Sequence, residues 1–243
     1  MIGAPGRTEP TSPHAAADKF YGLGLYRAPP ANPSETAVLI IHHLGVSQSD
    51  RVVWLMEELG LPYELVWHRR GPDGLAPASY LALHPAATAP VVQDGERTLS
   101  ESAAILEYIC HTYAGGRLTV PPQSPNHADY VYWMHFNNNI LGLFFARLAL
   151  AGQTEGRIAG LVGRREDGYA RFLEQTLAAS PYLAGPELTC ADIMSMFPLT
   201  SARMFGARDL PVTRAYVERI SRRPAYVRAM EIAGPAAVPP AEA

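Results

Sequence analysis

Two pairs of polar residues stand where the sequence predicts the starts of helices. Ser47 and Ser49 lie in a polar turn just before the amphipathic segment 52–59, and Glu101 and Ser102 begin a similar segment. A helix N-terminus carries free N–H groups and a partial positive charge, so each place could hold an anion. Serine and glutamate are also common in first turns, so ordinary capping is the alternative at both places.

Cysteine and histidine show no spacing typical of a metal site or of nucleophilic catalysis. The two cysteines, Cys110 and Cys190, lie far apart in the sequence and form no Cys-x-x-Cys pair. Neither stands at the start of the first helix, and the spacing suggests no Ser-His-Asp arrangement. We therefore expect no metal, no disulfide framework and a reducing, cytoplasmic location.

The segment 36–113 predicts an α/β domain that would position these residues. Residues 37–41 form an apolar, β-branched run typical of a buried parallel strand. The amphipathic helix that follows ends at Gly60, and a second strand completes a βαβ unit. The expected later elements are the strand at 63–67, a short helix at 79–83, a strand at 89–92, an Asp94-Gly95 turn, a strand at 97–99 and a helix from 101 or 102 to 113.

The second half of the chain predicts helices only, so the fold class is α/β plus all-α. A segment rich in Gly and Pro, 114–125, is the expected linker, and 126–232 is expected to be an all-helical domain. The Pro-rich segment 1–35 and the segment 233–243 are expected to be flexible tails. The expected helices of the second domain lie at 127–150, 155–179 and 189–205, with two shorter ones after them.

Two features of the helical domain predict structure and no chemistry. Thr189 and Asp192 have the spacing of a capping box, in which each residue satisfies a backbone N–H at the start of a helix. Phe144, Phe145 and Leu148 on the long helix are expected in the core.

Charge and hydropathy argue against several partners. The formal net charge is -3 and the sequence pI about 6.2, without the basic excess typical of nucleic-acid binding or of attraction to an anionic membrane. No apolar run is long enough to cross a bilayer, and the N-terminal region lacks the pattern of a secretory signal. We expect neither nucleic acid nor membrane as a partner.

Four segments together resemble the cytosolic glutathione S-transferases, in particular a bacterial and fungal branch with a serine-type site. The segments are His-His-Leu at 42–44, RVVWLMEELGLPYE at 51–64, YWMHF at 132–136 and ADIMSMFPL at 191–199. The resemblance implies a thioredoxin-like N-terminal domain, a helical-bundle C-terminal domain, a homodimer, and glutathione as co-substrate.

The resemblance gives the serine pair a specific role. Glutathione reacts as its thiolate, and free thiols are mostly protonated at neutral pH. Ser47 would donate a hydrogen bond to the thiolate at the helix start, adding to the partial positive charge there. Ser49 is the competing candidate, and either serine could be a simple cap.

The other glutathione contacts are also implied by the family motif. A cis peptide bond before Pro90 would leave the backbone of Ala89 free to pair with the cysteinyl part, and a trans proline at a strand start is the alternative. Glu101 would meet the ammonium group of the γ-glutamyl end, and Ser102 its carboxylate.

The glycine carboxylate of glutathione is assigned to the basic loop at 68–70, with Arg69 as the main candidate and a solvated loop as the alternative. Just before Pro90 the chain departs from the family pattern. Ala87 stands where relatives commonly have Gly, and Thr88 where they have a longer polar residue. Thr88 remains a candidate contact. Its shorter side chain predicts weaker glutathione binding, and compensation by Arg69 and Arg70 is the alternative.

The pocket for the second substrate is expected on the long helix. Tyr130, Trp133, Phe136 and Asn137 fall on neighbouring turns, and packing in the helical core is the alternative for each. The predicted function is a detoxifying transferase acting on a hydrophobic electrophile, with organic peroxide reduction as a close variant. A glutathione-dependent isomerase or dehalogenase would share these features, and a non-catalytic binding or stress protein is the alternative from another class.

Overall fold

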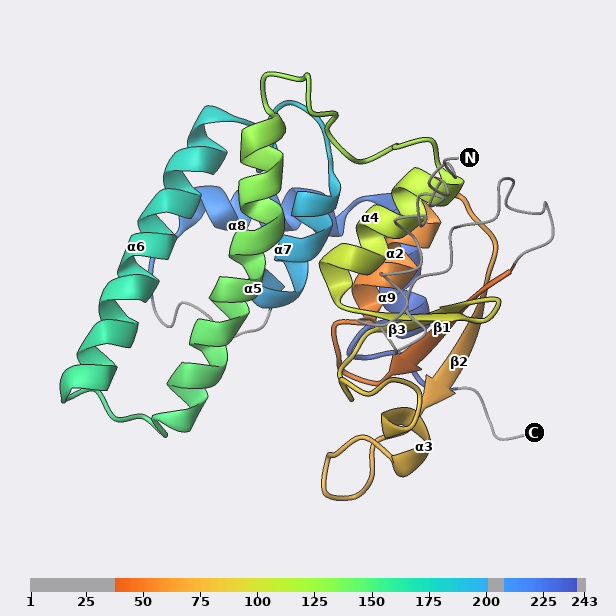
Figure 1. Cartoon of the computed structure of the whole chain (residues 1–243). Coiled ribbons are helices and arrows are strands. Elements are labelled where there is room, and N and C mark those ends of the chain that lie inside the picture. Colours follow the sequence, from red (N-terminus) through yellow and green to blue (C-terminus); the bar gives the residue numbers. More distant parts are fainter. Residues whose placement is uncertain (1–37, 201–207, 240–243) are drawn as a thin grey trace, which may run out of the picture. The chain divides into compact units, whose positions relative to one another are not determined.

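The computed structural model of the chain describes residues 38–200 and 208–239 (Figure 1). The segment 1–35 and the last residues of the third expected helix of the second domain, 201–205, lie outside the described residues. So does the end of the expected C-terminal tail, 240–243.

A four-stranded sheet forms the centre of the first domain, in the order β2-β1-β3-β4. β1 is parallel to β2 and antiparallel to β3, and β3 is antiparallel to β4. This sheet, with helices between its strands, confirms the predicted thioredoxin-like domain. The strands are β1 (Leu39–Leu44), β2 (Tyr63–His68), β3 (Val91–Asp94) and β4 (Arg97–Ser100).

Several strand boundaries differ from the sequence expectation. β3 runs from Val91 to Asp94 instead of 89–92. β1 extends to Leu44, beyond the expected strand 37–41, so His42 and His43 belong to it. The β3–β4 turn is shifted by one residue, because Asp94 pairs with Arg97 and leaves Gly95 and Glu96 in the turn.

Three helices accompany the sheet: α2 (Asp50–Leu59), α3 (Ala78–Leu81) and α4 (Ser102–Tyr113). Gly60 ends α2 in the left-handed conformation, with φ 65°, and its N–H bonds to the Met56 carbonyl. The main core includes the buried side chains of Ile41 from β1, Leu55 from α2 and Ile105 from α4.

The second half is helical, as predicted (Figure 1). At the start of α7, the Thr189 N–H donates to Asp192 Oδ2 at 2.9 Å, which confirms one of the two bonds of the capping box. The Thr189 hydroxyl donates to the same oxygen at 3.1 Å instead of accepting from a backbone N–H. The same carboxylate also accepts from the Tyr216 hydroxyl at 2.8 Å, so Asp192 is structural. The helices are α5 (His127–Ala149), α6 (Arg157–Ala179), α7 (Cys190–Thr200), α8 (Pro211–Ser221) and α9 (Pro224–Ala233).

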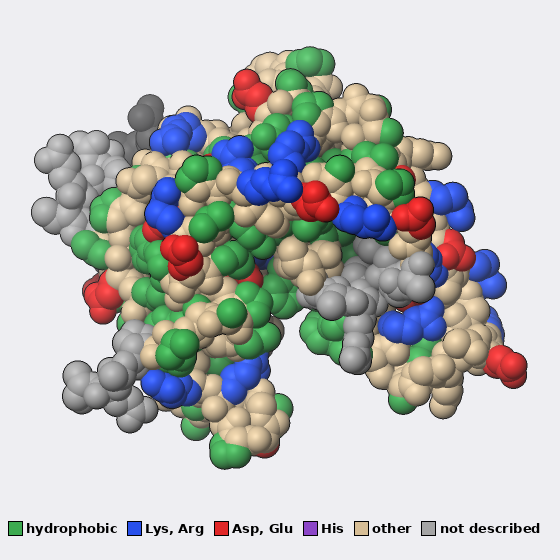
Figure 2. All heavy atoms as spheres, turned by 180° about the vertical axis from the view of Figure 1, so that it is seen from behind, with side chains coloured by type: hydrophobic (Ala, Val, Ile, Leu, Met, Phe, Trp, Pro, Cys, Tyr) green, Lys and Arg blue, Asp and Glu red, His purple; other side chains and the backbone are tan. Residues whose placement is uncertain are grey.

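The last helix returns to the first domain. α9 packs on α2, where the Trp54 and Tyr226 rings meet edge to face at 5.0 Å. Arg223 donates two hydrogen bonds to Glu58, each 2.8 Å long. Burial alone would raise the pKa of Glu58, but the hydrogen bonds from Arg223 and Trp54 outweigh it and hold that pKa below its usual value. On the face shown in Figure 2, basic and acidic side chains lie among each other.

The core prediction for the end of α5 was wrong in two of three positions. Phe145 and Leu148 are 57% and 49% exposed, and only Phe144 packs against the core. The last turns of α5 pair with α6, for example through Arg147 and Glu166, so the opposite side of these turns remains uncovered.

The two cysteines meet in space despite their separation in the sequence. Cys110 on α4 and Cys190 on α7 are both buried, and their Sγ atoms lie 3.4 Å apart as free thiols. Burial and the neighbouring thiol make Cys190 hard to ionise and raise its pKa, with the hydrogen bond to Cys110 as the largest cause. Both belong to the packing between α4 and α7.

Candidate active site

The loop that carries Ser47 starts at the same end of the sheet as the basic loop. In the parallel pair of β1 and β2, Leu44 lies opposite His68, so the segments that follow the two strands leave the sheet together. One of these segments contains Ser47 and leads into α2, and the other begins with Arg69.

The remaining candidate residues come to this end through the antiparallel strands. β3 begins at Val91, which pairs with His42 near the end of β1, so Ala89 and Pro90 lie just beyond it. Ser100, the last residue of β4, also pairs with Val91. The start of α4, with Glu101 and Ser102, therefore follows at the same end, and the Ala89–Pro90 peptide bond is cis, as the resemblance implied.

The two serines are joined to each other and to His43. Ser47 Oγ and Ser49 Oγ are 2.8 Å apart, and Ser49 Oγ lies 2.8 Å from His43 Nδ1. Ser49 stands at the N-cap of α2 but its side chain makes no capping bond. Ser49 is fully buried, whereas Ser47 keeps 8% of its surface exposed.

Arg70 fixes the turn before Ser47. Its Nε donates to the Gly45 carbonyl at 2.7 Å and its Nη2 to the Val46 carbonyl at 3.2 Å. Val46 has a φ of 51°, an unfavourable conformation for a β-branched residue that the surroundings must hold. Sequence reasoning grouped Arg70 with the carboxylate-binding loop and missed this contact, because it joins segments far apart in the chain.

The start of α4 is linked to α2 through Arg51. Arg51 Nη1 donates to Ser102 Oγ at 3.2 Å and to Gln48 Oε1 at 2.5 Å. Since Ser102 Oγ accepts this bond, its own hydrogen remains available to an acceptor such as a carboxylate. Glu101 is exposed and has a φ of 75°, which is rare for a residue with a side chain. No pattern in the sequence indicated this role of Arg51.

Asp50 and Arg51 are both buried at the start of α2. Burial raises the pKa of Asp50 to about 7 against the attraction of Arg51, and burial lowers the pKa of Arg51 to about 10. Within the described part of the chain, Asp50 Oδ1 and two Arg51 nitrogens, Nε and Nη2, have no hydrogen-bond partner. A buried guanidinium with two nitrogens in this state costs stability, so the place of Arg51 beside Ser102 is better explained by the site than by the fold.

The segment before Pro90 has one residue in a conformation that favours glycine. Ala87 has a φ of 50°, where glycine is unstrained. Thr88 is exposed, and its carbonyl accepts from the Tyr80 hydroxyl at 3.4 Å. Arg69 is also exposed, in the loop after β2.

Residues 47–112 match the family model described as Glutathione S-transferase, N-terminal domain. Glutathione S-transferase 3 of Schizosaccharomyces pombe is 30% identical over 213 residues, in a match that covers 77% of this chain and 85% of that protein. The chain belongs to the glutathione S-transferase family.

Solved structures agree with this assignment. A glutathione S-transferase from Actinobacillus pleuropneumoniae superposes with a TM-score of 0.75 at 32% identity, covering 81% of this chain and 93% of that one. A theta class glutathione S-transferase from Xanthomonas axonopodis pv. citri, solved with glutathione bound, gives 0.63 at 26% identity, covering 82% and 100%. The names of these relatives support glutathione transfer as the general activity of this family member.

In this glutathione S-transferase family member, the four candidates for the second-substrate pocket are buried. The Trp133 and Phe136 rings pack 5.1 Å apart, together with Phe172 of α6. Asn137 donates to the Trp133 carbonyl at 2.7 Å and to the Ala191 carbonyl of α7 at 3.0 Å. These contacts lie in helix packing and lend the pocket assignment no support.

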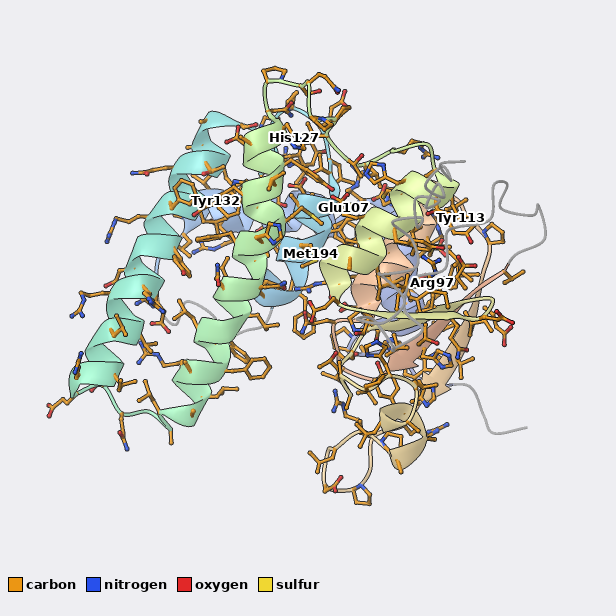
Figure 3. The ribbon with its side chains drawn as sticks, in the orientation of Figure 1. Arg97, Glu107, Tyr113, His127, Tyr132 and Met194 are labelled. Carbon is orange, nitrogen blue, oxygen red and sulfur yellow. The ribbon has the colours of Figure 1, made fainter. Side chains whose placement is uncertain are left out.

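Tyr130 donates to Glu107 of α4 and lines a cavity of about 530 Å³ together with His127. Figure 3 shows Glu107 on α4 and His127 at the start of α5. This cavity contains none of the candidate glutathione residues.

Within 38–200 and 208–239, no group of three or more His, Cys, Asp or Glu side chains could hold a metal ion. No helix in the same residues has both the length and the apolar character needed to cross a membrane.

Proposed function

We propose that this chain is a glutathione transferase that binds glutathione at the end of the sheet described above and activates its thiol for attack on a hydrophobic electrophile. The observation that carries the proposal is the convergence of the segments after β1, before β3 and after β4. Reduction of an organic peroxide by the same thiolate is a variant of this chemistry.

Each part of glutathione has a partner of suitable chemistry. Ala89 offers backbone groups to the cysteinyl part. Ser102 and the free N–H groups at the start of α4 suit the γ-glutamyl carboxylate, and Glu101 suits the ammonium. Arg69 and Thr88 are the contacts for the glycine end. Glutathione is a co-substrate, and the proposed reaction needs no metal.

Ser47 is the proposed donor to the thiolate. Its partial exposure supports this choice over the fully buried Ser49. In this role Ser47 stabilises the sulfur anion and forms no covalent intermediate. A charged hydrogen bond of this kind contributes about 1.5–3 kcal/mol, which lowers a thiol pKa by about one to two units.

Glutathione binding and conjugation to a chlorinated nitrobenzene test the proposal. The unmodified chain should be retained on immobilised glutathione and should form the conjugate. Ser47→Ala should raise the bound thiol pKa by about one to two units and lower turnover at neutral pH about tenfold, with a small change in affinity. Ser79→Ala on α3 is the control. A chain that neither binds nor conjugates would refute the proposal and favour a non-catalytic role.

We also propose a homodimer, which the family resemblance implies. Light scattering coupled to size-exclusion chromatography would measure the mass in solution. A mass near that of a single 26.4 kDa chain at micromolar concentration would contradict it.

A further inference from the structure

A chain of three buried side chains leads from β1 to the proposed thiolate donor. His43 Nδ1, Ser49 Oγ and Ser47 Oγ follow one another at 2.8 Å each. His43 and Ser49 have no exposed surface. Neither residue has a part in the function proposed above, and Ser49 makes no helix cap.

The number of hydrogens decides the donor–acceptor direction along these three side chains. Ser47 must keep its own hydrogen to donate to a thiolate, so it has to accept from Ser49. The Ser49 N–H already donates to Ser47 Oγ at 3.3 Å, in the same direction. Once the Ser49 hydroxyl donates to Ser47, Ser49 Oγ must accept from His43, and the Leu44 N–H also donates to it at 3.3 Å. This requires the His43 tautomer with its hydrogen on Nδ1.

A separate observation favours the same tautomer. His43 Nε2 is buried and has no hydrogen-bond partner among the described residues. With the hydrogen on Nδ1, the atom left over is an acceptor lone pair. With the hydrogen on Nε2, it would be an N–H, and buried N–H groups without a partner are the rarer and costlier case.

His43 is a poor proton acceptor in this place. Burial, together with the smaller effect of His68 on β2, lowers its pKa to about 4. The ring packs edge to face on Trp67 at 4.2 Å. A neutral ring at physiological pH can donate from Nδ1 but does not take the glutathione proton. His43 therefore orients the hydrogen bonds of the two serines and does not act as a base.

We infer that His43 and Ser49 are positioning residues, which hold the Ser47 hydroxyl with its hydrogen toward the glutathione sulfur by donating in sequence from His43 Nδ1 to Ser49 and from Ser49 to Ser47. The inference rests on the proposed function. Donors arranged in one direction polarise each other, so removal of an inner member weakens the outer bond.

The test measures the pKa of the bound glutathione thiol from its ultraviolet thiolate absorbance against pH, at saturating glutathione. Ser49→Ala and His43→Phe should each raise it by about half to one unit, and kcat at neutral pH should fall about three- to tenfold. His43→Asn places an amide N–H near the position of Nδ1, and its thiol pKa should stay closest to that of the unmodified chain. His43→Gln, whose amide lies further out, should behave like His43→Phe.

His42→Asn is the matched control, because His42 lies on the opposite face of β1 and contacts His68 and Gln93 instead of the serines. It should leave the thiol pKa unchanged. Nitrogen NMR of histidine-labelled protein gives a second readout that needs no variant to fold well. It should show His43 protonated at Nδ1 at neutral pH.

The outcomes separate this inference from the proposed function. The inference alone would be overturned by the following result. The unmodified chain binds glutathione and lowers its thiol pKa, and this pKa changes in Ser47→Ala but not in Ser49→Ala or His43→Phe. An Nε2–H tautomer, or equal effects of His43→Asn and His43→Phe, would do the same. Absence of glutathione binding by the unmodified chain would refute both.

Discussion

Replacing Arg51 with methionine tests whether its guanidinium prepares Ser102 for glutathione. Methionine has a similar length and no donor, so the change removes the 3.2 Å bond from Arg51 Nη1 to Ser102 Oγ. The Ser102 hydrogen is then no longer directed outward by an inner donor. A bound carboxylate would lose a fixed partner and a nearby buried positive charge.

The size of the effect follows from the burial of Arg51. A hydrogen bond with a charged partner contributes about 1.5–3 kcal/mol. Because Arg51 acts on the ligand only through Ser102, we expect its loss to reduce the binding free energy by about half of that amount. Glutathione affinity should fall about five- to tenfold. The free energy of unfolding should change by less than about 2 kcal/mol, because the guanidinium is itself buried with Nε and Nη2 unpaired.

Calorimetric titration of glutathione into Arg51→Met, Ser102→Ala and the double variant gives the assay. If both residues act through their contact, the double variant loses about 1 kcal/mol less binding energy than the two single losses added together. Losses that add within about 0.3 kcal/mol would refute the reasoning. Arg117→Met is the control, since Arg117 bonds to the Leu59 carbonyl at the far end of α2.

Two further changes test the strained and buried positions around the site. Ala87→Gly should raise the free energy of unfolding by about 0.5–1 kcal/mol in urea, because the φ of 50° suits glycine, and a loss of stability would contradict this. Burial raises the pKa of Asp50 from 3.8 to about 7, so the folded state holds a proton between these values and stability falls as pH rises through them. Between about pH 4 and pH 8, the free energy of unfolding of Asp50→Asn, measured in urea, should therefore rise relative to that of the unmodified chain by up to about 4 kcal/mol. A difference that stays constant with pH would contradict this prediction.

Most elements of the fold could be predicted because their signals are local. Gly60 marks the end of α2, and the βαβ unit follows from the change between apolar runs and helical spacing. The end of β1 could not be predicted in this way, because the apolar run that indicates the strand stops at Ile41 and two histidines follow it. In the folded chain His42 contacts His68 and Gln93, and His43 contacts Ser49, so each buried ring has a partner that comes from elsewhere.

The site was predictable as a set of positions and not as a network. Family motifs indicated Pro90, Glu101 and Ser102 by their order along the chain, and β-strand register brings them to one end of the sheet. Arg51 was not recognised as a neighbour of the site, and Arg70 was expected to bind a carboxylate and not to hold the turn before Ser47, since each acts on a segment distant in sequence. The buried contact between Cys110 and Cys190 escaped sequence reasoning for the same reason.

The two serines proposed to hold glutathione share one physical arrangement that no motif describes. A serine hydroxyl has one hydrogen and can point it toward the protein or toward a ligand. Ser102 accepts from Arg51, and Ser47 accepts from the Ser49 N–H, so each hydroxyl oxygen has a lone pair engaged by an inner donor. Its hydrogen is then left for the anion, a carboxylate at Ser102 and a thiolate at Ser47. Serine is therefore suited to both places only because a buried donor stands behind it, and the donors deserve the same mutational scrutiny as the serines.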